Sequence, residues 1–256
     1  MSLSAVVITG NEEDNLKECL ASLGFCDEVI VVDDNSTDRS VQIAREFGAK
    51  VFERALNADF AAQRNFALSL SKGEWVLFVD ADERVSESLA SEISKIKNTA
   101  LPAGRQKPRF SGYYIKRQDN IWGKWLRHGE FGSIKLLRLA RAGSGKWQRR
   151  IHEEWKITGN VGQLKNCLLH YPHRTLREFI SDVNWMSSLH AEENFKEGKR
   201  SNVLKIHFWP KVKFFNNWVL RLGLLDGTAG FIAALMMSFH SFLAWSKLWK
   251  LQKEQK

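Results

Sequence analysis

The chain has 256 residues, of which 44% are hydrophobic and 26% are charged. These proportions are ordinary for a globular protein and exclude a chain that is disordered throughout. The net charge is +9, and ten Lys or Arg against Asp226 and Glu254 leave a surplus of +8 in residues 199–256 alone. This asymmetry indicates an anionic partner at the C-terminal end, either a membrane surface or a nucleic acid.

The cysteines, Cys19, Cys26 and Cys167, are odd in number and lack CxxC spacing. This pattern argues against a disulfide framework or a zinc site, and a reducing compartment is expected. The first residues, MSLSAVVITGNEED, have neither a basic region nor a long apolar stretch, so no signal peptide is predicted.

Apolar runs alternate with helical patterns through the first 80 residues. Strands are predicted at residues 5–8, 29–32, 51–52 and 75–79, and helices at residues 16–23, 37–47 and 61–70. This alternation predicts an α/β fold, with a mostly parallel sheet that helices cover on both faces. In such sheets ligands bind beyond the carboxyl ends of the strands.

The second half of the chain is less regular. Residues 99–108 (TALPAGRQKP) are predicted to form an exposed loop. Later strands are predicted at 113–115 and 134–139, with a loop or bent hairpin rich in Trp and Gly between them. A helical pattern runs from residue 173 to about residue 200.

Two predicted strands end on acidic residues. Asp33 and Asp34 follow VIVV, and Asp80 and Asp82 follow WVLFV. Carboxylates two positions apart on an extended chain point to the same side, and such oxygen ligands suit Mg²⁺ or Mn²⁺. The structural alternatives are a polar strand end for the DxD and a helix N-cap for one aspartate of the other pair. The absence of GxGxxG and GxxxxGK[ST] disfavours a dinucleotide-binding Rossmann domain or a P-loop NTPase.

Four segments, taken together and in order, resemble the family 2 glycosyltransferases of the GT-A fold: VVITGNEEDNL (6–16), VIVVDDNSTD (29–38), AAQRNFAL (61–68) and WVLFVDADE (75–83). The resemblance implies an inverting enzyme that uses a UDP-sugar. It also implies a GT-A catalytic domain over residues 1–172, with a nucleotide-sugar half at about 1–98 and an acceptor half at about 109–172. Residues 173–256 would form a helical C-terminal region.

The same resemblance implies roles for individual residues. Asp80 and Asp82 would bind Mg²⁺ or Mn²⁺ and the diphosphate, with His152 as a further ligand of the metal or the phosphate. A hydrogen-bonded structural histidine is the alternative for His152. The nucleotide-sugar site would comprise Thr9, Asn11, Glu12, Asp33, Asp34, Arg64 and Asp80.

An inverting transferase needs a carboxylate base to take the proton of the acceptor hydroxyl. The segment HEEW at 152–155 offers Glu153 and Glu154, which cannot both point into one cleft because successive strand residues face opposite sides. Glu153 is the predicted base, because many members of the family that this chain resembles have a similar His-Glu pair after a basic stretch. Glu154 is the alternative, and a solvated strand edge would explain both residues.

A loop rich in aromatic and basic residues is the predicted acceptor site. Aromatic rings stack on sugars and basic groups suit phosphorylated acceptors, whereas ordinary packing under a flap is the alternative. The predicted acceptor residues are Trp122, Trp125, Arg127, His128 and Arg138.

RQDNIWGKWLRHG, KLLRL, HEEW and LLDGTAGF are similar to one subgroup, the β-1,4-glucosyltransferases that add glucose to heptose in the inner core of lipopolysaccharide. GEFGS (129–133) departs from the aromatic- and proline-containing stretch expected there. The resemblance therefore implies UDP-glucose as donor and this heptose as acceptor. The alternatives are transfer to a polyprenyl phosphate, and a non-catalytic membrane-binding or lectin-like module on a transferase fold.

GFIAALMMSFHSFLAW (230–245) is too short and too polar for the ~20 apolar residues of a spanning helix. Lys and Arg alternate with Trp and Phe around it, which predicts a helix lying in the headgroup region of an anionic leaflet. A helical hairpin packed on the catalytic domain is the alternative. We expect a peripheral protein on the cytoplasmic face of the inner membrane, and no nucleic-acid partner.

Overall fold

The computed structural model describes residues 1–98, 110–151 and 153–254. The chain divides into two compact units. The first comprises Met1–Arg117 and Lys135–His170, and the second comprises Gln118–Ile134 and Tyr171–Lys256. The segment 118–134, which the sequence assigns to the acceptor half, thus belongs to the helical second unit. The loop predicted at 99–108 lies outside the described residues.

The first unit is built on a mixed sheet with the strand order β3-β2-β1-β4-β8-β6-β11-β5. The four strands of the N-terminal part run parallel, whereas β8 is antiparallel to β4 and β6, and β5 to β11. The strands are β1 (Leu3–Thr9), β2 (Glu28–Asp33), β3 (Lys50–Glu53), β4 (Trp75–Asp80), β5 (Glu83–Val85), β6 (Gly112–Ile121), β8 (Lys135–Arg141) and β11 (Val161–His170).

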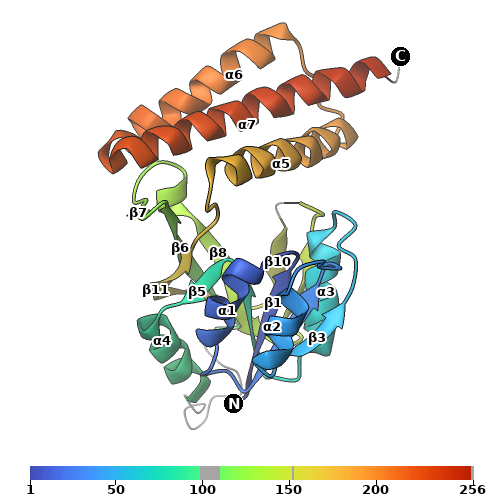
Figure 1. Cartoon of the computed structure of the whole chain (residues 1–256), viewed down its shortest axis with the longest axis vertical. Coiled ribbons are helices and arrows are strands. Elements are labelled where there is room, and N and C mark those ends of the chain that lie inside the picture. Colours follow the sequence, from blue (N-terminus) through green and yellow to red (C-terminus); the bar gives the residue numbers. More distant parts are fainter. Residues whose placement is uncertain (99–109, 152, 255–256) are drawn as a thin grey trace. The chain divides into compact units, whose positions relative to one another are not determined.

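Both faces of this sheet are covered, as Figure 1 shows. Successive residues of the central strands alternate between two cores: Ala5 and Val7 pack on one face, and Val6 packs on the other. The first face carries α1 (Glu13–Ala21), α2 (Ser40–Glu46) and α4 (Glu87–Asn98); the second carries α3 (Phe60–Leu70) and the ribbon of β9 (Gly145–Gln148) and β10 (Glu154–Ile157). The expected α/β fold class is confirmed, and its parallel part is the first four strands.

The register of β1 brings the two acidic strand ends together. Thr9 pairs with Asp33 on one side, and Ile8 pairs with Asp80 on the other. Both acidic clusters therefore lie at the same edge of the sheet, on either side of the end of β1. This is the arrangement that the parallel strand order predicts.

The second unit is largely helical. It begins with the end of β6, the short β7 (Lys124–Trp125) and η1 (Phe131–Ser133). Its last helix, α7, packs against the two helices before it, α5 and α6 (Figure 1). Its core contains Ile121, Leu126, Phe179, Val183, Ala233 and Met236. The helical elements are α5 (Leu176–Lys196), α6 (Val203–Phe215), the π-turn η2 (Asn216–Leu220), the 3-10 turn η3 (Gly223–Asp226) and α7 (Gly227–Glu254).

Helix α7 is longer than the sequence suggests. It has 28 residues, because the polar positions within the apolar run do not interrupt it; the Ser238 hydroxyl, for example, donates to the Pro210 carbonyl at 2.8 Å. Residues Gly223–Glu254 are long and apolar enough, by length and composition, to cross a membrane. The expectation that this segment is too short was therefore wrong.

Candidate active site

Asp33 and Asp34 shape the loops that follow β2. Asp33 is buried, and its carboxylate accepts hydrogen bonds from the Ser36 amide (2.8 Å) and the Ser36 hydroxyl (2.6 Å). Asp34 Oδ1 accepts from the Leu56 amide at 2.7 Å. Asp33 is thus engaged within its own turn, whereas Asp34, only partly buried, joins two loops at the edge of the sheet.

The loop after β1 is tied to the same region. Asn11 has a left-handed backbone (φ 56°), and its side-chain oxygen accepts from the Thr37 amide at 2.8 Å. The Glu12 amide donates to the Ser40 hydroxyl at 2.8 Å. Thr9 differs from both, because its hydroxyl is buried and has no hydrogen-bond partner among the described residues. A buried hydroxyl at this edge fits a site that takes a polar ligand.

Asp80 lies between two buried arginines. Its Oδ1 accepts from Arg64 Nη2 (2.8 Å) and Arg138 Nη1 (3.2 Å), and its Oδ2 pairs with Arg138 Nη2. Burial alone would raise the pKa of Asp80, but the two guanidinium groups outweigh it and hold the pKa far below its usual range. Each guanidinium is shared with a further carboxyl group, since Arg64 also contacts Glu153 and Arg138 Nη2 lies 3.5 Å from Glu83 Oε1. Guanidinium groups are the donors that suit an anionic group such as a diphosphate.

Glu153 completes this cluster. Arg64 Nε lies 2.9 Å from Glu153 Oε1, and the Glu153 side chain is 18% exposed. Glu154 begins β10, is exposed and forms an ion pair with Lys156. The two glutamates therefore face different surroundings, and Glu153 is the one beside Arg64.

The β9–β10 ribbon positions Arg64. The guanidinium of Arg64 lies 4.8 Å from the centre of the Trp147 ring, which stacks on Trp155 at 5.2 Å. Asn65, the next residue on α3, accepts from the Trp147 amide (2.9 Å) and donates to its carbonyl (2.8 Å). Trp147 was not predicted as a site residue, because no feature of the sequence indicates that β9 packs beside α3.

Asp82 and His170 form the pair that could hold a metal. His170 Nε2 lies 3.0 Å from Asp82 Oδ2. Burial would raise the pKa of Asp82, but the His170 imidazole outweighs it and lowers the pKa. Sequence reasoning missed His170, because β11 reaches β5 only through the antiparallel part of the sheet.

The donor set fits a cation that also binds phosphate. No group of three or more His, Cys, Asp or Glu side chains that could hold a metal occurs among the described residues. Mg²⁺ and Mn²⁺ need fewer protein ligands when a substrate diphosphate supplies oxygens, and a carboxylate with an imidazole suits Mn²⁺. Asp80, predicted as a second ligand, is engaged by Arg64 and Arg138. His152 lies outside the described residues.

The family model for glycosyl transferase family 2 matches residues 4–153, which include every residue of this cluster but His170. The chain belongs to this family. It is 30% identical over 261 residues to the lipopolysaccharide core biosynthesis glycosyltransferase LpsC of Rhizobium meliloti, covering 98% of this chain and 93% of LpsC. It is 27% identical to an uncharacterized glycosyltransferase of Rickettsia bellii, covering 97% of this chain and 86% of that protein.

Among solved structures, S. aureus TarS (residues 1–349) is similar with a TM-score of 0.47 and 18% identity, covering 100% of this chain and 92% of that one.

The predicted acceptor residues of this family 2 enzyme fall into two places. Trp122 and Gly123, with φ of 49° and 84°, form a two-residue turn between β6 and β7, and the Gly123 amide donates to Asn120 Oδ1 at 2.8 Å. Trp122 is 41% exposed. Trp125 instead packs edge-on against Tyr171 at 5.4 Å. Trp122 therefore has the exposure that stacking on a sugar requires, whereas Trp125 is partly buried against Tyr171.

Arg127 and His128 are fixed by Asp226 in the second unit. The amides of Arg127 (3.0 Å) and His128 (2.8 Å) donate to Asp226 Oδ2, and His128 Nδ1 lies 2.9 Å from Asp226 Oδ1. The prediction that groups Arg138 with these residues needs correction: Arg138 lies on β8 in the first unit, and its guanidinium pairs with Asp80. Sequence order could not show this, because β8 returns beside β4.

Proposed function

We propose that this family 2 glycosyltransferase transfers glucose from UDP-glucose, with inversion, to the heptose of the lipopolysaccharide inner core. The single observation that carries the catalytic part is that Arg64 contacts both Asp80 and Glu153. One cation thereby joins the predicted diphosphate site and the predicted base. The acceptor class rests on the similarity to LpsC, whose name assigns it to lipopolysaccharide core biosynthesis, and on the motifs of the second half.

The leaving UDP needs positive charge as the glycosidic bond breaks. Arg64 and Arg138 are 3% and 4% exposed, so water screens their charge weakly and an anion beside them would gain more than at the surface. In this proposal Thr9, Asn11, Glu12, Asp33 and Asp34 bind the nucleoside or shape its loops.

Asp82 and His170 would hold Mg²⁺ or Mn²⁺ in this proposal. The cation would supply further positive charge to the departing diphosphate. Glu153 would accept the proton of the heptose hydroxyl as that oxygen attacks the anomeric carbon. Because Arg64 already holds one oxygen of Glu153, the carboxylate is kept in a fixed orientation.

We further propose that the enzyme acts at the cytoplasmic face of the inner membrane, bound peripherally through its helical unit. Sixteen of the 22 large hydrophobic side chains exposed among the described residues lie between Val203 and Trp249. Residues 199–256, which include this region, carry +8 of the net charge of +9. Apolar and basic side chains on one helical region suit the headgroup layer of an anionic leaflet, where a glycolipid acceptor would also lie.

The test is isothermal titration with UDP-glucose, with and without Mn²⁺, against UDP-galactose and GDP-mannose. We expect binding of UDP-glucose alone, strengthened at least tenfold by Mn²⁺. Asp82→Asn should abolish that enhancement. Asp182→Asn is the matched control, because Asp182 also pairs with a histidine, His173 at 3.1 Å, on the surface of the second unit.

The acceptor is tested by turnover on lipopolysaccharide truncated at the heptose, with the anomeric configuration of the product read by NMR. A β-linked glucose is expected. Absence of nucleotide-sugar binding, even with this acceptor present, would overturn the proposal in favour of a non-catalytic module. Binding of UDP-glucose with transfer only to a polyprenyl phosphate would overturn the acceptor assignment alone.

A further inference from the structure

The connection between α6 and α7 exposes four leucines. Leu220, Leu222, Leu224 and Leu225 are 66%, 49%, 43% and 57% exposed. Leu222 also has a left-handed backbone, with φ 58°, which is uncommon for a bulky residue. Four leucines exposed together form an apolar patch of the kind that marks a protein- or membrane-interaction site.

Most of the other residues of this connection are buried or uncharged. Asn217, Gly223 and Asp226 are buried, and Arg221 is the one exposed charged side chain between residues 219 and 228. Asp226, the one acid of that stretch, has its carboxylate occupied by the amides of Arg127 and His128 and by the His128 ring. The outer surface of the connection, which we call the leucine tip (residues 219–225), is therefore apolar with one positive charge.

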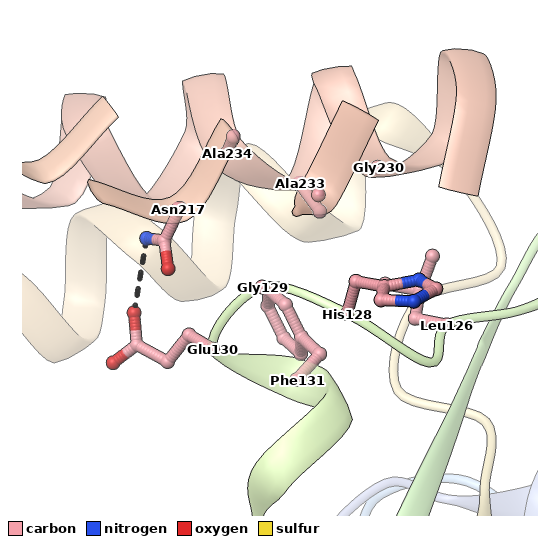
Figure 2. Close-up of a pocket in the computed structure, with 10 residues that line it drawn as sticks. Leu126, His128, Gly129, Glu130, Phe131, Asn217, Gly230, Ala233 and Ala234 are labelled. Atoms are coloured by element: carbon pink, nitrogen blue, oxygen red, sulfur yellow. Dashed lines mark hydrogen bonds between the residues drawn. The ribbon is translucent and has the colours of Figure 1, made fainter. Parts of the chain in front are cut away.

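The other side of the leucine tip contacts residues 127–130, which include the predicted acceptor residues Arg127 and His128 and which we call the acceptor segment. Besides the three contacts of Asp226, the Gly129 amide donates to the Arg221 carbonyl at 2.9 Å. Glu130 pairs with Lys213 Nζ at 2.8 Å, and its other contact, with Asn217 Nδ2 at 3.3 Å, is the dashed line in Figure 2. The small cavity between these groups, lined by Phe131 and Ala233 among others, has room for about one water. The segment is therefore secured to the helices rather than resting on them loosely.

We propose that the leucine tip inserts into an anionic lipid leaflet and that Asp226 acts as a positioning residue, holding the acceptor segment at that lipid-bound end. The inference deepens the proposed function and rests on it for the role of the acceptor segment. In this proposal the outer side of the connection between α6 and α7 inserts its leucines into the leaflet, and its inner side holds the segment that binds the lipid-linked sugar.

A lipid leaflet fits the tip better than a protein groove does. Arg221 is exposed within the tip and Lys211 is exposed near the end of α6, whereas the acid of the tip's connection, Asp226, is buried. An apolar turn bordered by cations suits a surface of anionic headgroups over acyl chains. The exposed apolar stripe continues along α6 through Phe208, Val212 and Phe215, as for a helix lying in the same surface.

Sedimentation with vesicles of phosphatidylglycerol and phosphatidylethanolamine tests the insertion. The full-length variant Leu220→Ser/Leu225→Ser should bind at least tenfold more weakly than wild type. The matched control is Leu176→Ser/Ile180→Ser, which removes two apolar side chains of similar exposure from α5 (50% and 43%) and should bind within twofold of wild type. Equal binding by all three proteins would overturn the insertion. Unchanged binding to vesicles with loss of binding to a partner protein would assign the tip to that partner instead.

Hydrogen exchange tests the role of Asp226 without requiring activity. Asp226→Ala should raise the exchange rates of the Arg127 and His128 amides at least tenfold. Asp226→Asn should keep them near wild type, because its amide oxygen still accepts from both amides and its NH₂ can donate to neutral His128. Unchanged exchange in Asp226→Ala would overturn the positioning role.

Kinetics separates positioning from general destabilisation. Asp226→Ala should raise the KM for vesicle-embedded acceptor at least tenfold and leave the KM for UDP-glucose within twofold, with Asp226→Asn restoring the acceptor KM. Equal increases in both KM values would mean that Asp226 is merely structural. If the wild type has no transferase activity the proposed function fails, while the vesicle and exchange measurements still decide this inference.

Discussion

Arg64 contacts two carboxylates that have different predicted tasks. Asp80 ends β4, and Glu153 immediately precedes β10. Since one guanidinium serves both, a substitution of Arg64 would disturb donor binding and base orientation together. The informative substitutions at this scale are therefore those of the carboxylates, which act one at a time.

Glu153→Gln should retain the affinity for UDP-glucose within a few-fold and lower kcat by about 10²–10⁴, because glutamine still accepts from Arg64 Nε but cannot take a proton. Glu154→Gln is the matched control, since that side chain is exposed and paired with Lys156, and its kcat should stay close to wild type. Steady-state kinetics and donor titration give both quantities. A reversed ranking of the two variants would move the base to Glu154.

The parallel strands of the first unit are held at their amino ends by one side chain, Glu28. Its carboxylate accepts from Lys50 Nζ (2.8 Å) on β3, from the Lys72 amide (2.7 Å) and from the Ser4 hydroxyl on β1. Burial alone would raise the pKa of Glu28, but these donors outweigh it and lower the pKa to about 2. The charged form is therefore more stable in the folded protein than in the unfolded chain.

Glu28→Gln should lower the free energy of unfolding by about 2 kcal/mol at neutral pH. A folded-state pKa below the unfolded value gives stability that is present above pH ~4.3 and is lost as the pH falls toward 2. The difference between variant and wild type should accordingly shrink between pH 5 and pH 3, measured by urea unfolding. Glu74→Gln, an exposed glutamate, should change the free energy by less than about 0.5 kcal/mol; a pH-independent effect of Glu28→Gln would contradict the argument.

Among the elements, the parallel half could be predicted from the sequence. Its strands are local apolar runs, and parallel order alone brings Asp33 and Asp80 to the two sides of β1. The antiparallel half could not be predicted in the same way. Its partners are set by pairings across long stretches of chain, so neither the contact of His170 with Asp82 nor that of Arg138 with Asp80 has a local signal.

The helical elements show a different limit of sequence reading. An apolar run shows where a helix is buried or binds lipid, and the run at 230–245 was found on that basis. The polar ends of α7 carry no such signal, so its length was underestimated. Asp226 was also overlooked as a structural group, because its three partners come from the segment 127–128 that only tertiary structure places beside it.

At the scale of the whole molecule, the uneven charge should govern adsorption to membranes. Lys211, Lys250 and Lys253 are exposed on α6 and α7, and each cation near an anionic surface contributes about 1 kcal/mol. The triple change to glutamine should lower the partition coefficient onto anionic vesicles on the order of 100-fold. It should also flatten the dependence of binding on salt concentration.

The control for this variant is Lys17→Gln/Lys72→Gln/Lys146→Gln, which makes the same change in net charge with exposed lysines of the first unit. It should bind anionic vesicles within a few-fold of wild type. Equal losses in both triple variants would mean that net charge, rather than the cations of α6 and α7, drives adsorption.

The position of α7 against both α5 and α6 limits how this protein can be divided. Ala233 and Met236 of α7 cover Phe179 and Val183 of α5 and share their core with Ile121 and Leu126. A truncated protein lacking residues 203–254 would expose these apolar side chains to water and loosen the segment that carries Trp122. The C-terminal helix therefore cannot be removed without disturbing the core of the second unit. A more soluble form of the enzyme is better sought by substituting polar residues for the exposed apolar residues of this helix than by shortening the chain.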